Sequence, residues 1–381
     1  MNPRENFYAA LQGKPHDRVP LWMREGFGSW YEPDGRDEFL NGWMSDPKHR
    51  HLQSAAEDAG AVFWRMWEPP MLNRFLMTSP AVIHMEEKRD GDIIRCFGTI
   101  ETPKGDLHFV NRMQRGIDTV WHEEVPVKAW SDVEKLLSVP FKMDESSIDS
   151  FHKHLRHLEE TSCPENTQVC VFIPSPIVTI SRCMPFADFL EKTIAESEAI
   201  HEILDIVTQR MLLSLDLLTP FISEEIPLWL GGSEQCTPPM MGPRSFDEFV
   251  KPYDGRLVRQ LKEKYGRVVG CHCHGRVAHA LSAMVEMGFD ATDPVEPPPQ
   301  GDVELAQAFS ITGNRLTLIG NMQYSELEHN SQEFIREKVR TASKSKEKRL
   351  ILGASAGPMS AIDDKLLENY LAWFDEYRKR F

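Results

Sequence analysis

The sequence predicts a single (β/α)8 TIM barrel over residues 1–381, with an N-terminal extension and an inserted β-hairpin. Eight short runs rich in β-branched and aromatic residues alternate with segments whose apolar residues have helical spacing. Neither an internal repeat nor a long linker interrupts this alternation. Eight strands separated by helices close most simply as a barrel, and catalytic groups then lie just past the C-terminal ends of the strands.

Each predicted strand is short and mostly apolar, and helical patterns fit between most of them. After Gly242, apolar residues recur at helical spacing from Phe246 to Leu257, and a last helix has an apolar stripe from Leu366 to Tyr377. The strands are expected at Arg18–Met23, Gly60–Trp64, Gln168–Ile173, Ile226–Gly231, Arg267–His272, Phe289–Thr292, Leu316–Gly320 and Arg349–Gly353.

Residues 90–121 differ from the rest of the chain. Polar and apolar residues alternate there on both sides of the turn sequence PKGD at residues 103–106. Alternation with a period of two is typical of a strand with one buried face. The pattern predicts a β-hairpin inserted after the second strand of the barrel.

Composition excludes several classes of function. The formal charge of −15 disfavours a nucleic-acid binder, because a phosphate backbone requires a basic surface. No stretch approaches the roughly 18 apolar residues of a membrane span, and the first residues lack the apolar core of a secretory signal. The 7 cysteines are sparse and odd in number, as expected of reduced thiols. We therefore expect a cytoplasmic enzyme without a membrane or nucleic-acid partner.

Two histidines mark the end of the fifth predicted strand. Side chains alternate faces along a strand, so His272 and His274 share one face while Cys271 and Cys273 share the other. Two imidazoles on one face are a common way to place metal ligands, and Zn²⁺ also accepts carboxylate oxygen. Alternatively, the histidines hydrogen-bond neighbouring carboxylates or an anionic substrate.

The third metal ligand would come from a neighbouring strand of the barrel. Glu296 follows the sixth predicted strand and Glu234 follows the fourth, so both reach the same mouth. Glu296 is the expected third ligand, and Glu234 is the expected fourth ligand or a catalytic acid. The choice between the two carboxylates stays open at the level of sequence.

Other candidates also lie just past strand ends. Arg24, Trp67 and Glu68 are expected to bind substrate, while Arg65 and Asn321 are candidate catalytic groups. For Arg65 and Glu68 the alternative is a structural ion pair, and for Asn321 it is the ordering of a metal ligand. Further large side chains either line the mouth or fill the barrel core, namely Trp22, Trp30, Phe63, Trp64 and Met66.

Several blocks in order along the chain resemble the uroporphyrinogen decarboxylase superfamily. They are RENFYAALQG (4–13), DRVPLWMR (17–24), PRSFDEFVKPY (243–253), HCHG (272–275), GFD (288–290), GNMQ (320–323) and ILGASAGP (351–358). The resemblance implies a (β/α)8 barrel. It also implies one of two activities, which are decarboxylation of uroporphyrinogen III without a metal and zinc-dependent methyl transfer through a corrinoid protein.

The chain departs from both branches at residues that their chemistry needs. The decarboxylase branch has a second arginine after Arg24, an aspartate after the second strand and a late histidine, where this chain has SAG at 355–357. The methyltransferase branch resembles it more closely, because His272 matches that branch's histidine. His274 stands in place of that branch's first cysteine and Ala356 in place of its last.

The resemblance and the departures together predict the substrate-specific methyltransferase of a corrinoid-dependent demethylation system. Ligands of nitrogen and oxygen would keep Zn²⁺ strongly Lewis-acidic, which suits a methoxylated aromatic or similar small methyl donor. The methyl group would pass to the Co(I) cobalamin of a separate corrinoid protein. A decarboxylase of tetrapyrrole metabolism is the alternative, and the resemblance leaves pairing into a homodimer open.

Overall fold

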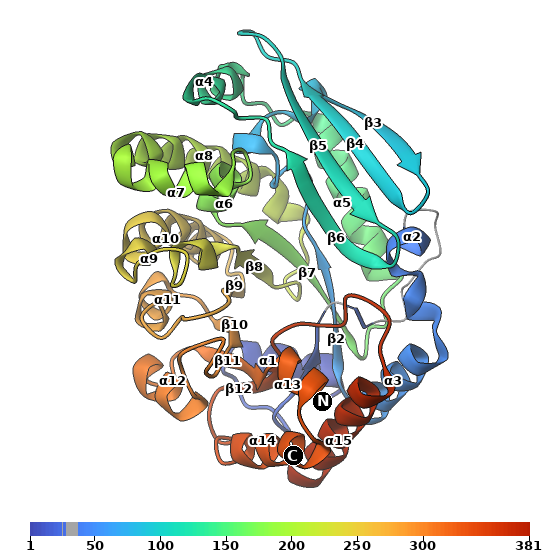
Figure 1. Cartoon of the computed structure of the whole chain (residues 1–381). Coiled ribbons are helices and arrows are strands. Elements are labelled where there is room, and N and C mark those ends of the chain that lie inside the picture. Colours follow the sequence, from blue (N-terminus) through green and yellow to red (C-terminus); the bar gives the residue numbers. More distant parts are fainter. Residues whose placement is uncertain (25, 28–36) are drawn as a thin grey trace.

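The centre of the molecule is a closed parallel barrel. The structure is a computed structural model that describes every residue except 25 and 28–36, so the expectation for Trp30 lies outside the described residues. The strands form a ring in the order β1-β12-β11-β10-β9-β8-β7-β2, which confirms the predicted (β/α)8 barrel (Figure 1). They are β1 (Leu21–Met23), β2 (Val62–Trp67), β7 (Thr167–Pro174), β8 (Leu228–Gly231), β9 (Val269–His272), β10 (Ala291–Val295), β11 (Thr317–Met322) and β12 (Leu350–Ala354).

Aromatic side chains fill the inside of the barrel. Trp64 contacts Trp22 and Trp229 edge to face, with ring centroids 5.3 and 5.1 Å apart. All three belong to one buried cluster with inward-facing residues of the other strands. Phe63, one residue from Trp64, packs instead in the outer layer between strands and helices because successive residues of a strand face opposite sides. Trp22 and Trp64 are therefore core residues.

Helices surround the barrel and close its N-terminal end. The predicted N-terminal extension is helix α1 (Pro3–Leu11), whose last carbonyl groups accept hydrogen bonds from Thr317 Oγ1. Figure 1 shows the other helices around the ring. They are α2 (Asp37–Asn41), α3 (Pro47–Asp58), α4 (Trp130–Ser138), α5 (Glu145–Glu160), α6 (Pro176–Ser181), α7 (Phe186–Ala195), α8 (Ser197–Leu218), α9 (Arg244–Phe249), α10 (Lys251–Arg259), α11 (Leu281–Met287), α12 (Leu305–Thr312), α13 (Tyr324–His329), α14 (Gln332–Ser343) and α15 (Asp364–Arg380).

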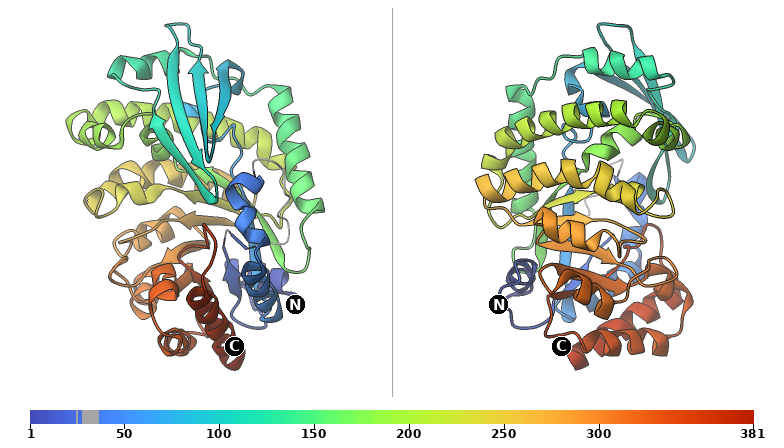
Figure 2. Two further views of the ribbon diagram at one scale, coloured as in Figure 1. Left: turned by 45° about the vertical axis from the view of Figure 1, so that its right-hand side comes forward. Right: turned by 90° about the vertical axis from the view of Figure 1, so that its left-hand side faces the viewer.

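The insertion after β2 is larger than the predicted hairpin. It is a four-stranded antiparallel sheet of β3 (Ile83–Asp90), β4 (Ile93–Ile100), β5 (Leu107–Gln114) and β6 (Ile117–Glu124). The predicted turn at 103–106 is confirmed as the connection from β4 to β5, and two further strands flank that hairpin. Figure 2 shows the sheet at one end of the molecule, with both chain termini at the other.

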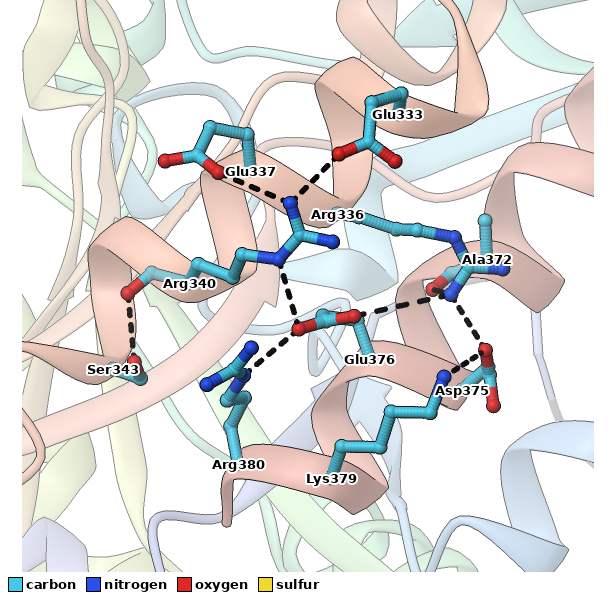
Figure 3. A network of polar contacts seen from close by, with 10 residues as sticks. All are labelled: Glu333, Arg336, Glu337, Arg340, Ser343, Ala372, Asp375, Glu376, Lys379 and Arg380. Atoms are coloured by element: carbon cyan, nitrogen blue, oxygen red, sulfur yellow. Dashed lines mark hydrogen bonds and ion pairs between the residues drawn. The ribbon is translucent and has the colours of Figure 1, made fainter.

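The last helix is attached to the barrel by packing and by ion pairs. Tyr370, Trp373, Phe374 and Tyr377 of α15 are buried, as the apolar stripe in the sequence predicts. Between α14 and α15, the buried carboxylate of Glu376 accepts hydrogen bonds from Arg340 and Arg380 and forms an ion pair with Arg336 at 4.0 Å (Figure 3). No helix in the described part of the chain has the length and apolar character needed to cross a bilayer.

Candidate active site

Three charged side chains meet at the C-terminal end of the barrel. Asp293 lies on β10, directly beside His272 in the register of β9 and β10, and its Oδ2 is 2.9 Å from His272 Nδ1. Arg24 follows β1 and reaches past β12 and β11 to donate from Nη1 to the same oxygen at 2.8 Å. A single carboxylate oxygen therefore holds both a histidine and an arginine.

Additional contacts fix the carboxylate of Asp293. Its second oxygen, Oδ1, accepts a hydrogen bond of 2.5 Å from Trp229 Nε1, and Asp293 itself is completely buried. Arg24 is 7% exposed, donates to the carbonyl oxygen of Ser355 at 3.3 Å and lies over the ring of Trp22. Trp229 and Arg24 therefore orient the carboxylate of Asp293, and that carboxylate orients the ring of His272.

The electrostatics favour a protonated His272. Burial alone lowers the pKa of an imidazole, but the carboxylate of Asp293 outweighs it, and the pKa of His272 is raised above its ordinary value. Burial would raise the pKa of Asp293, yet His272 and Arg24 together hold it below its usual range. The surroundings of the pair therefore favour the charged forms of both His272 and Asp293.

His274 forms a second pair next to the first. The rings of His272 and His274 are perpendicular, with centroids 4.6 Å apart, so the two histidines lie together as the sequence predicts. His274 Nδ1 is 3.4 Å from Glu296 Oε2, which also accepts a 2.5 Å hydrogen bond from the backbone N–H of Gly275. The side chain of His274 is 36% exposed, against 14% for His272.

The predicted zinc ligands do not fit a three-ligand site as they are placed. Each imidazole is paired with its own carboxylate, His272 with Asp293 and His274 with Glu296. Among residues 1–24, 26–27 and 37–381, no three His, Cys, Asp or Glu side chains are arranged to hold a metal ion. Zinc therefore stays a prediction from the sequence.

Two of the predicted site residues face away from the mouth. Arg65 is buried against α5 and donates to the carbonyl oxygen of Leu158 and to the hydroxyls of Thr161 and Ser162, at 2.7 to 3.0 Å. Trp67 packs on the same helix, against Phe151 and His154. The expected catalytic role of Arg65 and substrate contact of Trp67 are corrected to structural roles, because the inward face of β2 carries Val62, Trp64 and Met66 instead.

The remaining candidates are dispersed. Glu68 pairs with Arg182 at 3.1 Å, and not with Arg65, and lines a cavity beneath the antiparallel sheet. Asn321 lines a different cavity, between α12 and α14. Glu234 stays near the histidines, since its charge helps to raise the pKa of His272, and its buried Oε2 has no hydrogen-bond partner among the residues that the structure describes. The structure therefore groups Arg24, Glu234, His272, His274 and Glu296, but neither Glu68 nor Asn321.

Asp293 and Trp229 are the site residues that the sequence reasoning missed. Asp293 is the first residue after the predicted strand Phe289–Thr292, so its position was a usable signal. Its pairing with His272 depends on the register between β9 and β10, which one sequence does not reveal. Glu296, three residues later, was the more conspicuous carboxylate but pairs with His274.

The likeness to known proteins agrees with this architecture. A family model described as uroporphyrinogen decarboxylase (URO-D) matches residues 92–377. A methyltransferase from Methanosarcina mazei is similar in structure, with a TM-score of 0.64 at 15% identity over 100% of this chain and 99% of that one. A B12-independent methionine synthase from Shewanella sp. W3-18-1 has a TM-score of 0.49 at 9% identity, over 95% and 97% of the two chains. No curated protein matches by sequence.

Proposed function

Because the chain belongs to the uroporphyrinogen decarboxylase family, we propose that it is the methyltransferase of a corrinoid-dependent demethylation system. Its substrate would be a small methoxylated compound, and its acceptor the Co(I) corrinoid of a partner protein that docks at the barrel mouth. The observation that carries the proposal is the His272–Asp293–Arg24 arrangement, a buried proton donor at the strand ends.

The proposed reaction needs a proton at the oxygen that loses its methyl group. In this reaction Co(I) attacks the methyl carbon, the carbon–oxygen bond breaks, and its electron pair goes to the oxygen. His272 would protonate that oxygen from Nε2, because Nδ1 is engaged by Asp293. The products are a hydroxyl compound and methyl-Co(III), and the histidine regains its proton from solvent. General acid catalysis of this kind contributes about 10²- to 10⁴-fold.

The ionised Asp293 would keep His272 protonated until the transfer without giving up a proton itself. It stabilises the imidazolium before transfer and orients the ring, much as a buried aspartate orients a catalytic histidine in hydrolases. Arg24 would keep that carboxylate ionised in its buried position. Glu234, whose buried Oε2 has no hydrogen-bond partner among the described residues, would be available to contact the methyl donor.

The decarboxylase alternative is less well supported by the same geometry. A substrate with many carboxylates needs arginines with free charge at the mouth, and Arg24 is already engaged by Asp293 and by the carbonyl oxygen of Ser355. That arginine therefore offers little charge to an incoming carboxylate. A histidine acid is compatible with either reaction, so the assays must include both.

Methyl transfer to chemically reduced cob(I)alamin tests the proposal directly. A panel of methoxylated aromatics and methylamines is incubated anaerobically with the protein, and formation of methylcobalamin is followed spectrally, together with the demethylated product. We expect one donor class to give equal amounts of both products, and His272→Gln to lose at least 10²-fold in rate. Absence of transfer across the panel, with turnover in a porphyrinogen decarboxylation assay, would overturn the proposal in favour of the alternative.

A further inference from the structure

The cavity that Glu68 lines lies between the barrel and the inserted sheet. It has a volume of about 470 Å³ and is lined by the loop after β2, by α6, and by β5 and β6 of the sheet. None of Arg24, His272, His274 or Asp293 lines it, so it is distinct from the candidate active site. Its size falls within the range of small-molecule pockets.

Most of the charged groups in this cavity are already paired. Arg182 forms an ion pair with Glu68 at 3.1 Å and also contacts the side-chain oxygen of Asn73. His122 is hydrogen-bonded through Nδ1 to Asn111 at 2.7 Å, and burial lowers the pKa of its imidazole, which is therefore neutral near pH 7. Neither side chain has a free positive charge for a ligand.

Arg74 is the exception. It lines the cavity, it is half-buried, and within the described part of the chain it has neither an ion pair nor a side-chain hydrogen bond. Its Nε is buried without a hydrogen-bond partner, and burial lowers the pKa of its guanidinium. A partly desolvated cation without an anion costs free energy unless something pairs with it.

Next to this cation the cavity wall is apolar. The rings of Phe75 and Phe109 meet edge to face with centroids 4.9 Å apart, and both line the cavity. Met85 and Val120 of the sheet also line it and remain 60% and 45% exposed, so part of this apolar wall is open to a ligand. A ligand with an aromatic body would cover this surface.

We propose that this cavity binds a small aromatic carboxylate. The carboxylate pairs with the guanidinium of Arg74, and the ring packs on Phe75 and Phe109 beside Met85 and Val120. An arginine suits this task because its planar fork matches a carboxylate in geometry and its hydrogen bonds to an anion are charge-assisted. The inference does not depend on methyl transfer, because none of the residues placed at the barrel mouth lines this cavity.

Calorimetric titration of the full chain tests the proposal with benzoate as the probe. Benzamide, which has the same shape without the charge, tests the ion pair, and inorganic phosphate tests whether any anion suffices. We expect benzoate to bind at one site per chain and Arg74→Gln to weaken its binding by about tenfold or more. The matched control is Arg378→Gln, an exposed arginine on α15, which should bind benzoate as the parent does.

Stability measurements separate a ligand site from a structural arginine. Removing an unpaired, half-buried cation should leave the midpoint of urea unfolding unchanged or raise it, so Arg74→Gln loses binding and not folding. The proposal is overturned if benzoate does not bind the parent, if Arg74→Gln binds it equally well, or if benzamide or phosphate binds as tightly. A large loss of stability in Arg74→Gln would instead assign that arginine to the fold.

Discussion

His272 and Asp293 form a buried ion pair inside the mouth of the barrel, with Nδ1 of one 2.9 Å from Oδ2 of the other. The pair joins neighbouring strands in direct register, and Arg24 reaches the same oxygen from across the ring. Because the pKa of His272 is raised and that of Asp293 is lowered, the charged form of the pair is the stable one. Predictions about catalysis follow from this relationship.

Asp293→Asn should remove the proton from His272 at neutral pH. Without the carboxylate, burial lowers the pKa of the imidazole, so the alkaline limb of the rate profile should move to lower pH. We expect methyl transfer at pH 7.5 to fall by about 10²-fold. Titration of the His272 ring by NMR measures the pKa directly, and an unchanged value in the variant would refute the arrangement.

The free energy of unfolding, measured against pH, is a second test of Asp293→Asn. In the parent, the raised pKa of His272 stabilises the fold at pH values below the ordinary histidine pKa. That stabilisation is lost as the pH rises through the pKa of His272 in the folded state, and the variant should lack it. Asp290→Asn is the matched control, because Asp290 lies at the opposite end of β10 and pairs with Lys262. It should leave the alkaline limb of the rate profile in place.

The metal content of the purified protein tests the zinc prediction. The HxH pattern predicts about one equivalent held by His272, His274 and a glutamate, whereas in the structure each histidine is already paired with a different carboxylate. From these pairs we expect a folded protein with far less than one equivalent after anaerobic purification. About one equivalent in the parent and none in His272→Ala/His274→Ala would restore the zinc prediction and make His272 a ligand.

The fold was predictable because its signal is repeated and local. Each strand is a short apolar run followed by a helix, and all eight were located to within a few residues of their observed bounds. The inserted sheet was underestimated because β3 and β6 are largely exposed and polar, so their alternation is weak. Apolar periodicity identifies only strands with a buried face.

The candidate site was predictable only where the alternation of side chains between the two faces of a strand was used. His272 and His274 were placed on one face and do lie together. The same rule applied to Trp64, a core residue, would have turned Arg65 and Trp67 outward, as observed. The role of Asp293 depends on strand register, and the unpaired state of Arg74 depends on what surrounds it in three dimensions. Neither can be read from a single sequence.

Glu376→Gln should destabilise the C-terminal helix without affecting the active site. Glu376 is 3% exposed and accepts hydrogen bonds from Arg340 at 3.1 Å and Arg380 at 2.8 Å (Figure 3). Replacing the carboxylate by an amide weakens charge-assisted bonds, so we expect a loss of about 1–3 kcal/mol in the free energy of unfolding in urea. Glu368→Gln, an exposed change on the same helix, should cost less than about 0.5 kcal/mol.

The same carboxylate predicts an acid dependence. Arg380, acting with Arg340, holds the pKa of Glu376 below its usual range, so the stability it contributes is present above the ordinary glutamate pKa. That contribution is lost as the pH falls through the depressed folded value. The difference in stability between parent and Glu376→Gln should therefore shrink below about pH 4. A constant difference down to pH 3 would contradict the network's electrostatic role.

Asp254→Asn should flatten the pH dependence of stability near neutrality. Asp254 of α10 is buried, receives a single hydrogen bond of 2.7 Å from Ser175 Oγ, and burial raises its pKa to about 7. Between about pH 4 and 7 the unfolded chain has lost this proton and the folded chain keeps it, so stability falls as pH rises, by at most about 1.4 kcal/mol per pH unit. The asparagine carries no such proton, and the variant should equal or exceed the parent at pH 8. Asp247→Asn, an exposed aspartate on the adjacent α9, should retain the parent's slope, and an equal slope in Asp254→Asn would refute the assignment.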